Sequence, residues 1–227
     1  MYSHDKFDRE SVASRISVFR DQIERRLAGE ITEERFRPMR LENGVHLWDH
    51  AYMLSVPIPA GVLSADQLRM LAHVARTYDR GYAHLTASRS VEFHWPALSD
   101  IPSALADLAS AGLYPTGAGG DFNGDSGVDL IADAAHDQSD HASVTIPFAG
   151  GGDLSDDQLE ALANLAETYA SGGVQIDNGQ DLVLPHVARA NLASVHAGLV
   201  ASSLEDPRHS DFTPPTEAHH ARETEAA

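Results

Sequence analysis

Arg89 lies at the centre of a stretch, YDRGYAHLTASRSVEFHWP (residues 78–96), in which apolar and polar residues alternate. Such alternation is typical of a half-buried strand, and an arginine on a strand could bind an anion through its planar set of N–H donors. The next basic residue after Arg89 is Arg189, and the residues between them include sixteen Asp and Glu. An anion bound by Arg89 would therefore find no further Lys or Arg in this part of the sequence.

A second candidate site is the segment DFNGDSGVDL, which places oxygen-bearing side chains at short, regular spacing between glycines. The candidate ligands are Asp121, Asn123, Asp125 and Asp129. A short loop of this kind can wrap around Ca²⁺, and the segment resembles the calcium loops of FG-GAP repeats. Ser126 stands where a glycine is usual, and Ala132 replaces the distal glutamate of an EF-hand. The alternative interpretation is a flexible acidic loop without a metal.

Histidines are a weaker metal signal, although the chain has thirteen of them. The candidate ligands among them are His136, His141, His219 and His220. A metal site needs ligands held by rigid elements, which a polar tail does not provide, so we expect no physiological histidine site. His84 and His94 are interpreted as packing or surface residues rather than acid–base catalysts.

Ser88 and Ser90 are close to His84 in the sequence, which raises the question of whether either is a nucleophile. No nucleophile elbow or oxyanion glycine pattern surrounds them, so we predict no catalytic residue in this chain. The two tryptophans, Trp48 and Trp95, are interpreted as anchors in the core or at an interface.

Composition excludes several classes of function. The 227-residue chain has 34 acidic and 16 basic residues and a formal net charge of -18, which opposes binding to nucleic acids and to anionic membranes. It has no cysteine, so these residues supply no disulfide and no thiolate ligand for zinc or an iron–sulfur cluster. The N-terminus lacks the apolar core of a signal peptide, and no apolar run approaches the roughly 20 residues that span a membrane. We expect a cytoplasmic protein.

Apolar spacings of three and four predict the helices. Residues 11–29 are expected to form an amphipathic helix that ends at Gly29, and Pro102 is expected to begin a helix that ends at Gly112. Between them, residues 64–78 are typical of a helix with a capping box.

The same order of elements then reappears. LSADQLRMLAHVARTY and LSDDQLEALANLAETY are related by an offset of 91 residues, and each has a Ser at its second position and Gln three residues later. The pattern of each copy predicts a strand, a helix, a strand pair and a helix. This internal repeat predicts an α+β fold in which two pseudo-symmetric halves pack as one body, with an N-terminal helix and a disordered C-terminal tail.

The expected boundaries follow from the repeat and from shifts in composition. They are an N-terminal helical segment at 1–35, a first half at 36–114, a Gly/Asp-rich linker at 115–140, a second half at 141–202 and a disordered tail at 203–227.

These residues resemble the sirohaem-dependent nitrite and sulfite reductases. The stretch from FRPMRLENG to LASAGL is similar to the first ferredoxin-like half-domain of the sulfite reductase haemoprotein, and the second repeat, with IPF, LSDDQL and GQDLVLP, is similar to the second. The family implies paired halves, with separate larger segments that carry four cluster cysteines and most of the sirohaem cradle. About thirty residues separate the halves here.

The resemblance also implies where basic residues should lie. The family's strand typically reads Thr-Thr-Arg-Gln-Asn before an alternating stretch, and its arginine helps to hold sirohaem and the anionic substrate. Registering on Val91 and Phe93 places that arginine at Ser88, so we expect Arg89 to point to the opposite face of the strand. A second basic position of the family is Ser55 here, and GAGGDFNGDSG replaces the Gly-Asn-x-x-Arg-Asn segment.

Three functions remain open. The first is a non-catalytic accessory or regulatory protein, for example in sulfur assimilation, that binds a protein partner such as a sulfite reductase subunit and holds no cofactor when isolated. The alternative is an enzyme component, one part of a split reductase whose sirohaem and 4Fe-4S cluster come with a separate chain. In that case Arg89, Arg40 or Arg37 could face the shared sirohaem. A calcium-responsive module is a third interpretation.

Overall fold

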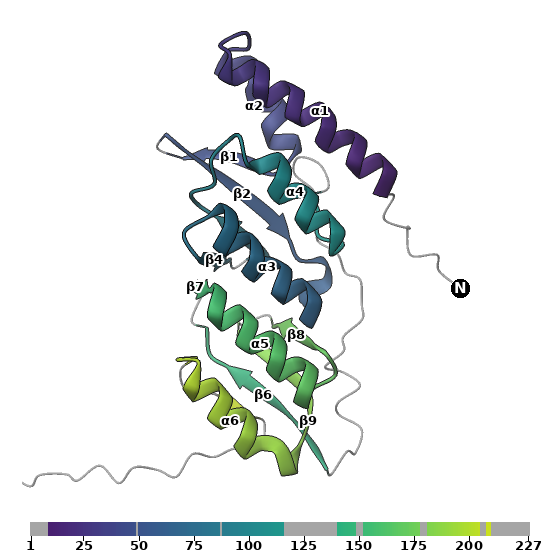
Figure 1. Cartoon of the computed structure of the whole chain (residues 1–227). Helices are drawn as coiled ribbons and strands as arrows, with labels where there is room; N and C mark the ends of the chain where they lie inside the picture. Colours follow the sequence, from purple (N-terminus) through teal and green to yellow (C-terminus); the bar gives the residue numbers. More distant parts are fainter. Residues whose placement is uncertain are drawn as a thin grey trace, which may run out of the picture.

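The computed structural model describes residues 9–48, 50–86, 88–115, 140–148, 152–177, 181–204 and 208–209 (Figure 1). The helices in these residues are α1 (Arg9–Leu27), α2 (Glu33–Glu42), α3 (Ala65–Tyr78), α4 (Ile101–Ser110), α5 (Asp156–Tyr169) and α6 (Leu192–Ala201), with short 3-10 helices η1 (Pro59–Gly61) and η3 (Arg189–Asn191). The strands are β1 (Val45–Trp48), β2 (Ala51–Pro57), β3 (Val62–Ser64), β4 (Tyr82–Leu85), β5 (Ser90–Phe93), β6 (His141–Ile146), β7 (Gly152–Ser155), β8 (Gly173–Ile176), β9 (Leu182–Ala188) and β10 (Arg208–His209).

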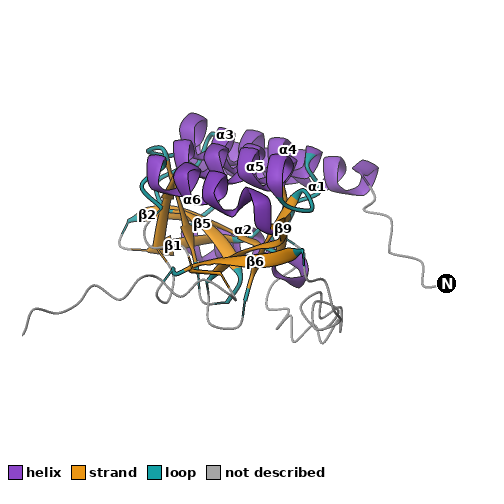
Figure 2. Cartoon of the chain, turned by 90° about the horizontal axis from the view of Figure 1, so that it is seen from below, coloured by secondary structure: helices purple, strands orange, loops and turns teal. Residues whose placement is uncertain are grey.

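Helices and strands form separate layers. Figure 2 shows α1, α3, α4, α5 and α6 on one side of the strands, and Figure 1 shows α3 and α5 side by side at the centre. The expected α+β fold with two ferredoxin-like halves is confirmed, as is the expected N-terminal helix, α1.

The capping boxes that the sequence predicts are present as hydrogen bonds in the structure. Ser64 accepts a hydrogen bond at 3.2 Å from the backbone N–H of Gln67, whose side chain accepts one at 2.9 Å from the N–H of Ser64. Ser155 and Gln158 repeat this capping box with the same two distances. Gly29 follows α1 with φ +78°, a left-handed conformation that glycine adopts without steric cost.

The strands form two five-stranded antiparallel sheets, in the orders β1-β2-β5-β4-β7 and β10-β6-β9-β8-β3. Each sheet therefore contains one strand from the other half of the sequence. β7 of the second half pairs with β4, and β3 of the first half pairs with β8. The two halves are joined by main-chain hydrogen bonds as well as by side-chain packing.

Backbone contacts at this exchange repeat with the offset found in the sequence. The N–H of Ala65 donates to the carbonyl of Gly172 at 2.9 Å, and the N–H of Asp156, 91 positions after Ala65, donates to the carbonyl of Gly81 at 2.9 Å. Gly81 is also 91 positions before Gly172. The repeat is thus a pseudo-two-fold in space as well as in sequence.

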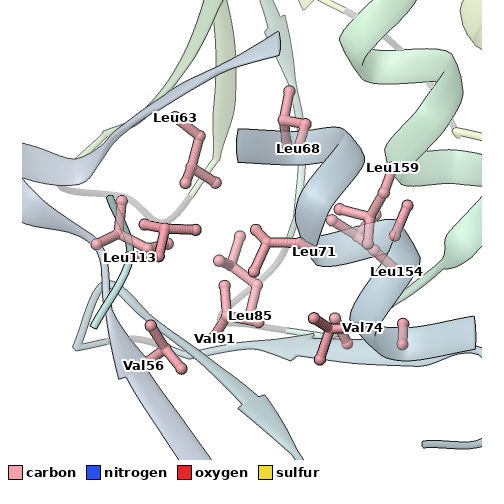
Figure 3. Close-up of a cluster of buried hydrophobic side chains, with 14 of the residues drawn as sticks. Val56, Leu63, Leu68, Leu71, Val74, Leu85, Val91, Leu113, Leu154 and Leu159 are labelled. Atoms are coloured by element: carbon pink, nitrogen blue, oxygen red, sulfur yellow. The ribbon is translucent and has the colours of Figure 1, made fainter. Parts of the chain in front are cut away.

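The hydrophobic core is shared by the two halves. Figure 3 shows Leu71 and Val74 of α3 near Leu154 of β7 and Leu159 of α5, all of them buried. Burial of one such side chain contributes about 1.5–3 kcal/mol, so separation of the halves would expose a costly apolar surface.

One helix, α2, has no counterpart among the sequence-based expectations. It begins after Thr32, whose side chain accepts a hydrogen bond from the N–H of Arg35, and it contains Pro38.

Part of the segment expected to be a disordered tail, Arg208–His209, forms strand β10, which pairs with β6. Residues 210–227 lie outside the described part of the chain. No helix among the described residues is long and apolar enough to cross a membrane.

Candidate functional site

The first sheet has a polar face that points away from the helices. In β2 and β5 the buried residues Leu54, Val56, Val91 and Phe93 alternate with half-exposed ones, and residues paired across antiparallel strands share a face. We call the half-exposed side the open face. Its residues are His46, Trp48, Ala51, Met53, Ser55, Pro57, Tyr82, His84, Ser90, Glu92, His94, Asp153 and Ser155.

Two histidine–carboxylate pairs lie at the centre of the open face. Nδ1 of His84 is 2.9 Å from Oδ1 of Asp153, a contact between β4 and the exchanged strand β7. Nε2 of His94 is 3.4 Å from Oε2 of Glu92, and the centroids of the two imidazole rings are 5.2 Å apart. The half-exposed positions agree with the interpretation of both histidines as surface residues. The pairs add two carboxylates to the middle of the face.

Three hydroxyl groups continue the face at the turn between β4 and β5. Oγ1 of Thr86 is 2.9 Å from Oγ of Ser88 and 2.7 Å from Oγ of Ser90, and the two serine oxygens are 3.3 Å apart. A serine becomes a nucleophile when a general base accepts its proton. These three hydroxyls lie within hydrogen-bond distance of one another, and the absence of a catalytic residue stays a prediction.

Arg89 occupies this turn and not a strand, which corrects the sequence-based expectation. Its φ is +57°, its N–H donates to the carbonyl of Thr86 at 3.1 Å, and its carbonyl accepts from the N–H of Ile58 at 2.9 Å. Because Arg89 is outside the strands, strand alternation does not determine which face of the sheet its side chain points to. The side chain lies against Gly61, where a Cβ would be 3.0 Å from Cδ of Arg89 and 3.1 Å from the carbonyl oxygen of Ile176.

Arg40 and Arg37 are the other two arginines expected to be able to face a shared sirohaem; Arg40 is buried and Arg37 is exposed. Arg40 is buried, with Nε 2.8 Å from Glu33 and Nη1 donating at 3.0 Å to the carbonyl of Val45. These bonds make Arg40 a structural residue of α2 and β1. Arg37, on the same helix, is exposed.

The open face does not fit an anionic cofactor. Ser55 and Ser88 are the positions at which the resemblance implies basic residues, and Ser55 is paired directly with Glu92. Anion sites use converging Arg and Lys to offset charge, and here hydroxyls are accompanied by the carboxylates of Glu92 and Asp153. Sirohaem, sulfite and nitrite are all anionic, so like charge opposes their binding.

Most of the candidate metal ligands lie outside the residues that the structure describes. Asp121, Asn123, Asp125 and Asp129 lie outside the described residues, as do three of the four candidate histidines, so calcium binding stays a prediction. Within the described ranges, no group of three or more His, Asp or Glu side chains could hold a metal ion.

The tryptophans are exposed, so the interpretation as core anchors is wrong. Trp48 is 77% exposed and Trp95 53% exposed, and Tyr82 of the open face is 55% exposed. The guanidinium carbon of Arg80 lies 4.2 Å from the centroid of the Trp95 ring, a cation–π contact. The interpretation as interface anchors remains a prediction.

The sequence contains a signal for part of this site. Because side chains alternate along a strand, Glu92 and His94 could be assigned to one face from the buried pattern of Val91 and Phe93. The contact of His84 with Asp153 could not be found this way, because these residues are 69 positions apart and meet only through the strand exchange.

The fold and the repeat define a two-copy ferredoxin-like domain, and comparison with known families gives its class. The chain matches the nitrite/sulfite reductase ferredoxin-like half domain over residues 49–111 and 136–202. It therefore belongs to the family of proteins built on this half domain.

Curated relatives match over a small part of their length. An assimilatory ferredoxin-dependent nitrite reductase of Haloferax mediterranei is 36% identical over 80 residues, which cover 31% of this chain and 14% of that protein. A sulfite reductase [ferredoxin] of Mycobacterium tuberculosis is 31% identical over 70 residues, or 31% of this chain and 13% of that protein. The matched region is thus about one seventh of each relative.

A solved structure supports the fold. The Mycobacterium tuberculosis NirA protein superposes with a TM-score of 0.62 at 15% sequence identity, over 84% of this chain and 68% of that one. At this identity the likeness concerns the fold alone.

Proposed function

We propose that this chain is a non-catalytic relative of the nitrite and sulfite reductases that acts by binding another protein. The observation that carries the proposal is the charge of the open face. Ser55 and Ser88 stand where the family resemblance implies cations. Ser55 is paired with Glu92, and Asp153 lies two strands beyond Glu92 on the same face. A face that repels sirohaem and its anionic substrates is unsuited to their reduction.

Composition supports the same conclusion. The 227 residues contain no cysteine, so thiolate ligands for a 4Fe-4S cluster would have to come from another polypeptide segment. Residues 90–188 contain no Lys or Arg. This range includes all of β5 and β7 and most of the second half.

The scaffold itself is well formed. Both capping boxes, the exchanged strands and the shared core are in place. Three aromatic side chains on this scaffold, Trp48, Tyr82 and Trp95, are exposed, and exposed Trp and Tyr are common anchors at protein interfaces.

Titration of the purified chain with sirohaem tests the proposal, with absorption as the readout. We expect no saturable spectral change with the wild type. A Ser55→Arg, Ser88→Arg double variant tests whether charge is the obstacle, and Ser103→Arg on α4 controls for an added cation elsewhere. Saturable one-to-one binding of sirohaem by the wild type would contradict the proposal.

The split-reductase alternative gives a different result. In that case the wild type would bind sirohaem only with a cysteine-bearing partner chain, and the mixture would gain six-electron reduction of sulfite or nitrite.

A further inference from the structure

Exposed aromatic side chains lie at two sides of the open face. Trp48 is on edge strand β1 and Tyr82 is on β4, separated by β2 and β5 in the sheet order. Three strand spacings correspond to about 14 Å, the length of four to five residues of an extended chain at about 3.3 Å per residue. An extended segment lying across the strands could therefore contact both rings.

Carboxylates lie on the same face as these aromatics, with Glu92 on β5 and Asp153 on β7, the strand beyond β4. The side chain of Asp153 is 65% exposed and that of Glu92 is 23% exposed, and the whole chain carries a net charge of -18. Charge complementarity favours a basic occupant of the face. It disfavours a second copy of this chain, and it disfavours residues 116–139 of the same chain, which contain five Asp and no Lys or Arg.

The molecule already contains one contact of the kind such an occupant would make. Arg80 stacks over Trp95, the residue that follows His94 of the open face, at 4.2 Å from the ring centroid. Arginine on an exposed aromatic ring is thus compatible with this region of the surface. Trp48 and Tyr82 offer rings of the same kind to an arginine of a partner.

From these observations we propose that the open face docks an extended, arginine- or lysine-rich segment of a partner protein. Trp48 and Tyr82 contact the cationic side chains through their rings, and Glu92 and Asp153 pair with them. This inference rests on the proposed function, because it names the chemistry of the partner that the non-catalytic scaffold binds.

A fluorescein-labelled peptide of about ten residues with alternating Arg and Thr is a suitable probe, and a Glu/Thr peptide of equal length is its control. Anisotropy is measured at about 50 mM and about 300 mM NaCl, because salt screens charge pairs. The test variants are Glu92→Gln with Asp153→Asn, and Trp48→Ala with Tyr82→Ala. Circular dichroism verifies that each variant is folded.

Matched controls remove exposed carboxylates and exposed apolar side chains from the helix layer. Glu24→Gln with Asp157→Asn removes two exposed carboxylates from α1 and α5, and Val18→Ala with Val200→Ala removes two exposed apolar side chains. We expect each open-face variant to weaken binding of the Arg/Thr peptide at least about fivefold, and each control to change it less than about twofold. The Glu/Thr peptide should not bind.

Three results would overturn the proposal. They are no binding of the Arg/Thr peptide by the wild type, equal weakening by open-face and control variants, or a dimer in sedimentation that Trp48→Ala dissociates, which would make a second copy the occupant. Each of these leaves the sirohaem titration unaffected, so failure of the docking surface and failure of the non-catalytic function are distinguishable.

Discussion

Arg69 of α3 is hydrogen-bonded to Glu167 of α5, and the pseudo-two-fold axis brings their equivalents, Arg76 and Glu160, together as a longer ion pair. The distance from Arg76 Nη2 to Glu160 Oε1 is 3.8 Å. An offset of 91 makes Glu160 the equivalent of Arg69 and Glu167 the equivalent of Arg76. Two copies of α3 packed in this way would place arginine against arginine, so the charges favour pairing of the first half with the second.

Reversal of one member of this pair should destabilise the fold. Arg69→Glu is expected to lower the urea midpoint because it places a carboxylate against Glu167, and Glu167→Arg is expected to lower it by facing Arg69. The double reversal should recover most of the loss, measured as a double-mutant cycle. Purely additive effects of the two changes would contradict direct pairing.

The shared core predicts one cooperative unfolding transition. Leu71→Ala in the first half and Leu162→Ala at the equivalent position of the second should each cost about 2–5 kcal/mol, because both side chains are buried. Both tryptophans lie in the first half, so their fluorescence reports on that half, whereas circular dichroism reports on both. The two signals should shift together in both variants. Separate midpoints would show that the halves unfold independently.

The contact of Arg89 with Gly61 predicts a sensitive glycine. Gly61 has φ +67° and little room for a Cβ, whereas Gly29 has φ +78° and nothing within 4 Å of an added Cβ. Gly29→Ala should cost about 1–2 kcal/mol for the left-handed backbone alone. Gly61→Ala should cost at least about 1 kcal/mol more, from urea denaturation. Adding Arg89→Ala should recover part of that difference; no recovery would mean that Arg89 does not restrict the site.

Stability at high pH should depend on Tyr78. Burial, together with a 2.8 Å hydrogen bond to Asp107, raises the pKa of Tyr78 to about 12 from 10.0. The resulting stability is complete below about pH 10, where both states are protonated, and is lost as the pH rises towards about 12. Tyr78→Phe should therefore reduce the alkaline loss of stability, measured by urea denaturation between these pH values.

The second half contains the control for this prediction. Tyr169 is the equivalent of Tyr78, but Gly198 stands at the position equivalent to Asp107. Tyr169→Phe should change the alkaline profile less than Tyr78→Phe does. An equal change in both variants would argue against the hydrogen bond to Asp107 as the cause.

Helices and the repeat could be predicted from the sequence because their signals are local. The capping pairs at Ser64 and Ser155 lie within four residues, and apolar periodicity identifies α1, α3 and α5 directly. The exchange of β3 and β7 could not be predicted, because a strand as short as Val62–Ser64 carries no information about its partner.

The same limit applies to the candidate site. Alternation continues in the sequence across the turn at Thr86 to Arg89, and no glycine or proline marks that turn, so the pattern alone predicts a strand at Arg89. Composition is more informative, because the absence of basic residues from 90 to 188 already indicates the acidic character that Glu92 and Asp153 give to the open face.

The most direct test of the non-catalytic function is an absorption spectrum with iron analysis on the chain purified from its native host, together with any proteins that remain bound. We predict a colourless, iron-free sample that is well folded by circular dichroism, with bound protein and no sirohaem. A sirohaem spectrum with stoichiometric iron would contradict this account and would identify the chain as a component of a reductase completed by a partner.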